Sequence, residues 1–122
     1  MTDEITLTFP PQQDFHRVAH LVLGGLAARI DLTIENLEDL QIAVDSILDG
    51  TDADGQPVTV SMTVRDGALE TTIGPVPSSI LDEAAREQGA QLGLRRVLDS
   101  TVDDVLIDGH TIRLTKKVAG GG

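Results

Sequence analysis

The segment from Thr33 to Gly50, TIENLEDLQIAVDSILDG, has the pattern of one long amphipathic helix. Its apolar stripe recurs every three or four positions and comprises Leu37, Leu40, Val44, Ile47 and Leu48. Thr33 is the expected N-cap, because its side-chain oxygen can accept a hydrogen bond from a first-turn N–H group, and Gly50 is the expected C-terminal stop. Asp45 and Asp49 are four residues apart, so their carboxylates share one face of the helix.

The composition indicates one globular domain with an aliphatic core. Of the 122 residues, 40% are hydrophobic and 24% are charged, but only two are Phe and none is Trp or Tyr. The core must therefore consist mainly of Leu, Ile, Val and Ala, and aromatic side chains that could stack on nucleic-acid bases are lacking. We predict a single domain over residues 1–118 and a disordered glycine tail over residues 119–122.

The charge balance restricts the classes of partner. Nine basic and twenty acidic residues give a formal net charge of −11, which argues against nucleic acid and against an anionic membrane surface. The absence of Cys excludes disulfides and thiolate metal ligands. No apolar run reaches the roughly 18 residues of a membrane span, and the N-terminus lacks a signal-peptide pattern. We expect a soluble cytoplasmic protein, and its acidity is compatible with a basic protein partner.

The residues before Thr33 predict a strand and a helix. The segment Ile5–Phe9 alternates apolar and polar residues and ends at two prolines, which is typical of an edge strand. Asp14 is expected to cap a helix that runs to Ile30. The buried stripe of this helix is predicted to comprise Phe15, Val18, Ala19, Val22, Leu26 and Ala27. Gly24 and Gly25 interrupt it, which predicts either the close approach of another backbone or a locally weak helix.

The second half of the chain predicts two hairpins with helical segments between them. Val58–Val64 and Ala68–Ile73 are separated by an Asp-Gly turn, and Val102–Ile107 and Thr111–Lys116 are separated in the same way. The strands therefore occur in adjacent pairs and do not alternate with helices. We predict an α+β two-layer sandwich with the helices packed on one face of a mostly antiparallel sheet.

Two stretches of the chain resemble a known family. Residues 17–46 (RVAHLVLGGLAARIDLTIENLEDLQIAVDS) are similar to its first helix, connector and second helix, and residues 91–117 (QLGLRRVLDSTVDDVLIDGHTIRLTKK) to its closing helix and hairpin. The family is the GHKL ATPase fold, and more closely the anti-sigma-factor serine kinases of the RsbW/SpoIIAB type. The resemblance implies a sigma factor or a STAS-domain protein as partner, a homodimer, and ATP and Mg²⁺ as cofactors.

The resemblance also assigns roles on the Thr33–Gly50 helix. The family carries Glu-x-x-x-Asn there, in which the Glu is the base and the Asn oxygen ligates Mg²⁺. Asp45 stands at the position of the base and is one methylene shorter than Glu. Asp49 stands at the position of the Mg²⁺ ligand and adds a negative charge beside the phosphates.

Two glycine motifs of the family have partial counterparts. Gly74 matches a glycine of the adenine-binding Asp-x-Gly-x-Gly turn, whose Asp is missing from this chain. Gly89, Gly93 and Leu94 match the phosphate-binding Gly-x-Gly-x-Gly-Leu, in which Gln91 replaces the middle glycine. The resemblance thus implies that Asp49, these three glycines and Leu94 bind the cofactor.

Because all three motifs depart from the family, three functions remain open. The first is a regulatory protein that binds a sigma factor or STAS-domain antagonist, with ATP binding weakened or lost. The second is an interaction module on the same fold that binds no nucleotide, and the third is an active ATP-dependent serine kinase. His16 and His20 have the spacing of a metal clip, but no third ligand is evident in the sequence. Arg95 is predicted either to pair with a neighbouring acid or to neutralise phosphate.

Overall fold

A five-stranded antiparallel sheet forms one layer of the protein, with strand order β1-β2-β3-β5-β4. The computed structural model describes residues 4–51, 55–85 and 93–118. The strands are β1 (Glu4–Phe9), β2 (Val58–Arg65), β3 (Ala68–Gly74), β4 (Asp104–Asp108) and β5 (Thr111–Lys117). The helical segments are η1 (Gln13–Phe15), α1 (His16–Arg29), α2 (Ile34–Thr51), α3 (Ser78–Ala85) and α4 (Leu94–Thr101).

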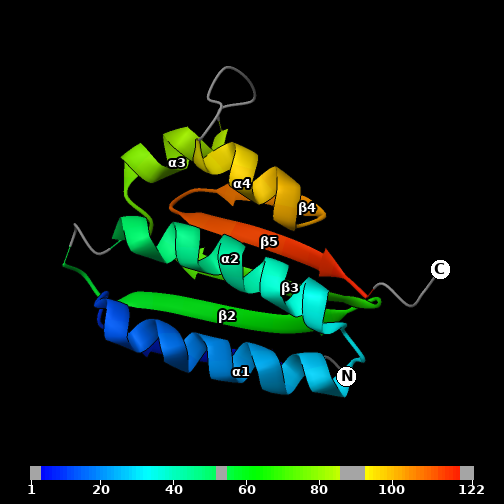
Figure 1. Cartoon of the computed structure of the whole chain (residues 1–122). Helices are drawn as coiled ribbons and strands as arrows, with labels where there is room; N and C mark the ends of the chain where they lie inside the picture. Colours follow the sequence, from blue (N-terminus) through cyan, green and yellow to red (C-terminus); the bar gives the residue numbers. More distant parts are fainter. Residues whose placement is uncertain (1–3, 52–54, 86–92, 119–122) are drawn as a thin grey trace.

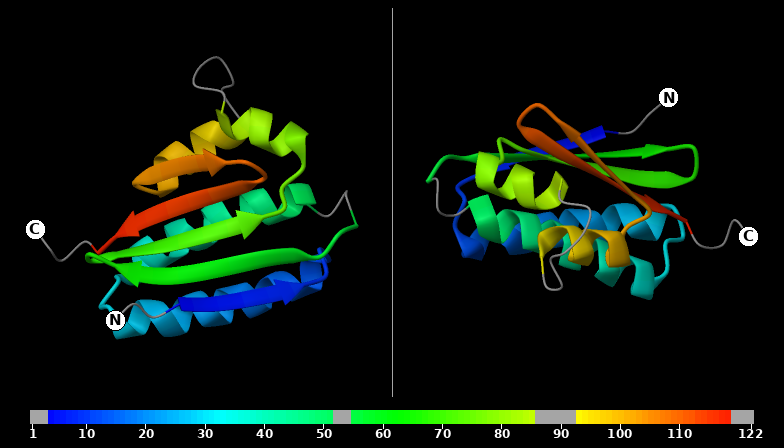
Figure 2. Two further views of the ribbon diagram at one scale, coloured as in Figure 1. Left: turned by 180° about the vertical axis from the view of Figure 1, so that it is seen from behind. Right: turned by 90° about the horizontal axis from the view of Figure 1, so that it is seen from above.

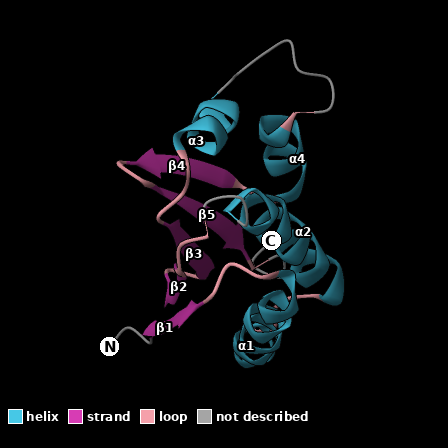
Figure 3. Ribbon diagram, turned by 90° about the vertical axis from the view of Figure 1, so that its left-hand side faces the viewer, coloured by secondary structure: helices cyan, strands magenta, loops and turns pink. Residues whose placement is uncertain are grey.

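All four α-helices lie on one face of the sheet, so the predicted two-layer α+β sandwich is confirmed (Figures 1 and 3). The core lies between the layers, where inward side chains of the strands pack against α1 and α2. Its fully buried members include Leu23, Leu40, Ile47, Met62, Ile73 and Leu114. None of the described helices is long and apolar enough to cross a lipid bilayer. The predicted domain limits remain a prediction, and residues 119–122 lie outside the described part.

The other face of the sheet is not covered by helices (Figure 2, left). Short hydroxyl side chains pair across its strands, with Thr6 Oγ1 3.3 Å from Ser61 Oγ and Thr8 Oγ1 2.9 Å from Thr59 Oγ1. This alternation of apolar inward and polar outward residues is expected for a sheet with one solvated face. The register of the strands therefore follows directly from their period-two pattern.

The helix α2 begins as predicted and ends later than predicted. The backbone N–H of Asn36 donates to Thr33 Oγ1 at 3.1 Å, so Thr33 is the N-cap. The prediction that Gly50 stops the helix is wrong, because α2 continues to Thr51. A Cβ at Gly50 would overlap the side chain of Ile80 on α3. Glycine at this position thus permits the close approach of α3.

The helix α1 differs from the prediction at its start and in its buried stripe, and it bears on the two alternatives left open for its glycines. Asp14 makes no capping bond, because the chain enters α1 through the 3₁₀ turn Gln13–Phe15, in which the Phe15 N–H donates to the Gln12 carbonyl. Val18 is 39% exposed, whereas Leu23 is fully buried. An added Cβ at Gly24 or Gly25 would meet no atom of another described element within 4 Å, so the predicted close approach of another backbone is not observed in the described part of the chain.

Candidate functional site

Two histidines of α1 face two aspartates of α2. His20 Nε2 lies 2.7 Å from Asp45 Oδ1, and His16 Nδ1 lies 3.7 Å from Asp49 Oδ1. Both pairs have i, i+4 spacing within their helices, and the helices run antiparallel, so the first histidine meets the last aspartate. Asp45 and Asp49 therefore point toward α1.

A polar cleft of about 350 Å³ opens over these pairs. It is lined by Gln13, Asp14, His16, Arg17, His20, Asp45 and Asp49. His16 is buried, and its Nε2 has no hydrogen-bond partner among the described residues. Within the same residues, no three His, Asp or Glu side chains are placed to hold a metal ion. The cleft thus offers hydrogen-bonding groups, and its two histidines lie against the two carboxylates of α2.

Gly93 stands at the start of α4, which packs on the flank of α2 opposite to α1. Gly93 precedes α4 with an extended backbone, and its carbonyl accepts hydrogen bonds from the N–H groups of Arg96 and Val97. Leu94 begins α4 and packs against the core. Figure 3 shows α2 between α1 on one side and the α3–α4 pair on the other. The structure therefore does not bring Asp45 or Asp49 together with Gly93, and Gly89 lies outside the described residues.

Gly74 stands at the end of β3, where it is buried. A Cβ there would lie 2.6 Å from Thr111 Cγ2 and 3.1 Å from the His110 carbonyl oxygen. The neighbouring Val76 N–H donates to the same carbonyl at 2.7 Å. Tight packing against β5 is thus sufficient to explain a glycine at this position.

Comparisons with known proteins agree with this architecture. No family model matches the chain. It is 24% identical to the serine-protein kinase RsbW of Listeria monocytogenes and to that of Listeria innocua, over 97% of this chain and 89% of each relative. The chain is homologous to the RsbW serine-protein kinases.

A solved structure shares the fold of this RsbW homologue. The crystal structure of the RsbU and RsbW domains of a Mycobacterium tuberculosis protein matches it with a TM-score of 0.70 at 12% identity. The match covers 95% of this chain and 32% of the other, so this chain spans about a third of that structure's length. The predicted resemblance is confirmed, and the homology supports a regulatory role.

The described residues of this RsbW homologue do not fit the Mg²⁺–ATP site that the resemblance implies. Successive residues of a helix are rotated by about 100° around its axis. Asp45 and Asp49 point toward α1, so the residues that follow them, Ser46 and Gly50, point away from α1. The contact between Gly50 and Ile80 places that second flank against α3. The Ser46 hydroxyl donates to the Ile42 carbonyl within its own helix. The flank of α2 toward α3 thus carries neither a carboxylate nor an amide at these two positions.

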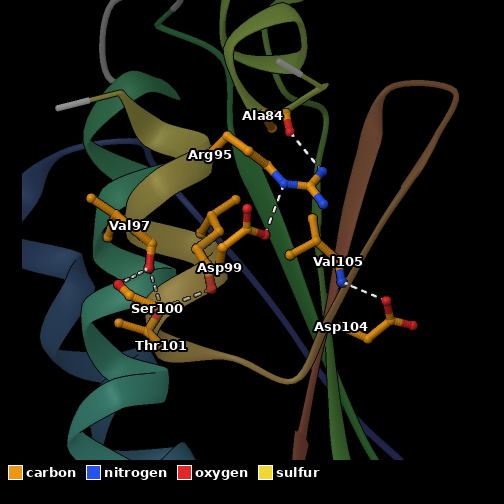
Figure 4. Close-up of polar contacts among 9 residues, drawn as sticks. Ala84, Arg95, Val97, Asp99, Ser100, Thr101, Asp104 and Val105 are labelled. Carbon is orange, nitrogen blue, oxygen red and sulfur yellow. Dashed lines mark hydrogen bonds and ion pairs between the residues drawn. The ribbon is translucent and has the colours of Figure 1, made fainter. Parts of the chain in front are cut away.

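Arg95 joins α3 to α4 (Figure 4). Its Nε donates to Asp99 Oδ1 at 2.9 Å, and its Nη1 donates to the Ala84 carbonyl at 3.0 Å. The first of the two alternatives predicted for Arg95, an acidic neighbour, is therefore observed. The spacing of Arg95 and Asp99, four residues apart on a helix, already indicated this pair.

Lys116 is a buried cation that the sequence reading did not single out. Its Nζ donates to the Thr101 carbonyl at 2.7 Å and lies 3.6 Å from Asp39 Oδ2. It occupies the inward register of β5 after Ile112 and Leu114. Period-two alternation alone could have placed it there, because every second residue of that strand is buried.

Proposed function

We propose that this chain is a regulatory protein that acts by binding a protein partner, and that its ATP binding is weak or lost. The partner class is a sigma factor or a STAS-domain antagonist, as the relation to RsbW suggests. The observation that carries the proposal is the position of Asp45 and Asp49, which pair with histidines of α1 on the flank of α2 away from Gly93. A nucleotide held at the glycine turn would not meet a base or a metal ligand from this pair.

The contact between Gly50 and Ile80 supports the same proposal. In a kinase of this kind, α2 must present oxygen ligands to the metal that bridges the phosphates. Here a side chain of α3 packs directly against the α2 backbone at Gly50. Binding of a protein partner needs only an exposed surface, so it is compatible with the direct contact between α3 and α2 at Gly50.

The nucleotide part of the proposal is tested by thermal melting with and without Mg²⁺–ATP. A ligand at about a hundred times its dissociation constant adds about 2.7 kcal/mol of stability. We expect no shift of the melting temperature at millimolar nucleotide. A shift that disappears in Asp49→Ala, together with phosphate on a partner serine, would establish the active kinase in place of this proposal. Asp108→Ala is the matched control, because Asp108 is an exposed acid on β4, outside α2.

The partner part is tested by titrating the full chain with purified sigma factors and STAS-domain proteins of the source organism. We expect one of them to bind with a defined stoichiometry in the absence of nucleotide. Binding that requires ATP would contradict the proposal. Analytical ultracentrifugation of the free chain in the same series tests the homodimer that the resemblance implies.

A further inference from the structure

Large apolar side chains are exposed on both α1 and α2. On α1 they are Val18, 39% exposed, and Leu21, 77% exposed; on α2 they are Ile34, 76% exposed, and Ile42, 49% exposed. The remaining exposed large apolar residue of the described part is Leu106 on β4. The two helices lie side by side over the sheet (Figure 1). An apolar group gathered on one face of a soluble domain marks an interaction site more often than scattered single residues do.

Two glycines, Gly24 and Gly25, leave α1 without side chains one turn after Leu21. Gly24 and Gly25 each cost a helix about 1 kcal/mol relative to Ala. An added Cβ at either position would meet no atom of another described element within 4 Å, so packing among the described residues does not require glycine there. Their missing side chains leave the backbone accessible to a partner that packs on this face.

The charges on α2 identify the kind of partner. The helix carries five acidic residues and no basic residue, namely Glu35, Glu38, Asp39, Asp45 and Asp49. Asp39 and Asp45 have Lys116 and His20 as partners within the chain. Glu35 and Glu38 are exposed and stand between Ile34 and Ile42 along the helix. Exposed apolar groups thus alternate with carboxylates, which is complementary to an amphipathic segment with Lys or Arg beside its apolar residues.

We infer that the outward face of α1 and α2, defined by Leu21, Ile34, Glu35, Glu38 and Ile42, binds a basic amphipathic helix of a partner protein. The inference rests on the proposed function and adds the surface and the chemistry of the partner to it. A second copy of this chain that docked through α2 would bring Glu35 and Glu38 against the same carboxylates, which disfavours that arrangement. An anionic membrane would be repelled for the same reason.

The test uses a synthetic helical peptide of Leu and Lys in amphipathic order and a peptide of the same composition in scrambled order. Fluorescence anisotropy with the full chain should give a dissociation constant about tenfold lower for the ordered peptide, because only that peptide presents its apolar side chains together. The double substitution Leu21→Ser with Ile42→Ser should weaken binding about tenfold. Leu106→Ser is the matched control and should leave binding unchanged, because Leu106 lies on the sheet edge.

Amide chemical shifts locate the peptide. We expect changes on α1 and α2 and none on the solvated face of the sheet. Equal binding of the scrambled peptide, or changes confined to the sheet, would overturn the inference, and so would a dimer in the free chain that the double substitution dissociates. If a natural partner binds the double variant as tightly as the native chain, the inference fails and the proposed function stands. If no sigma factor or STAS-domain protein binds the native chain, the proposed function itself fails.

Discussion

His20 on α1 lies 2.7 Å from Asp45 on α2, and this contact fixes the flank of α2 on which the paired carboxylates stand. A carboxylate in a hydrogen bond with a neighbouring imidazole is held in one orientation, here toward α1. On the flank toward α3, α2 carries Gly50, whose missing side chain leaves space for Ile80. The fold shared with the RsbW homologues is thus retained, while Asp45 and Asp49 of α2 point toward α1.

Removal of the His20 side chain should destabilise the fold slightly. Both partners are about a third exposed, so water screens the pair and its contribution should stay below about 1 kcal/mol. Urea unfolding of His20→Ala, Asp45→Ala and the double variant measures the coupling between them. Strictly additive effects would show that the contact contributes nothing, and a loss of several kcal/mol would show a second role for His20.

The glycine at position 50 should be intolerant of a larger side chain. Gly50→Val places branched carbons where Ile80 lies, and we expect it to destabilise the protein by about 1–3 kcal/mol. In an Ile80→Ala background the same substitution should cost less, because the overlapping atoms are gone. Gly25→Ala is the control: a Cβ at Gly25 would meet no atom of another described element within 4 Å, so the gain in helix propensity should stabilise α1 by up to about 1 kcal/mol. Equal costs of Gly50→Val in both backgrounds would show that Ile80 is not the obstacle.

The sequence predicted what local patterns determine and missed what depends on the angle between elements. Thr33 as N-cap, the α2 stripe and the hairpin at Asp66–Gly67 follow from neighbours in the chain, and the positive φ angles of that Asp-Gly pair fit its tight turn. The helix end at Gly50 was wrong, because α2 continues to Thr51, and the contact of Gly50 with Ile80 on α3 could not be inferred from neighbours in the chain. The site required knowing to which side of α2 Asp45 points, and a shift of one residue turns a helical side chain by about 100°.

Substitution of the buried Lys116 should cost more than that of its exposed neighbour. Lys116→Met removes the donor to the Thr101 carbonyl and leaves Asp39 without its cation, so we expect a loss of about 1–3 kcal/mol. Lys117→Met, next in the chain and exposed, should change stability by less than about 0.5 kcal/mol. Chemical denaturation of both variants provides the comparison. A Met at 116 that leaves the midpoint unchanged would indicate that hydrophobic packing replaces the ion pair fully.

Loss of the Arg95 side chain should loosen α3 without unfolding the sheet. Arg95 connects the last turn of α3, through the Ala84 carbonyl, to Asp99 on α4 (Figure 4). With Arg95 only partly exposed, we expect Arg95→Ala to weaken the attachment of α3 by about 1 kcal/mol, which corresponds to about fivefold more frequent local opening. Hydrogen exchange should therefore accelerate at α3 amides and remain unchanged in β2 and β3. Arg96→Ala, at an exposed position of the same helix, should leave α3 exchange as it is. If α3 exchanges equally in the two variants, Arg95 does not hold the helix, and the apolar contacts of Ile80 and Leu81 with the core must do so alone.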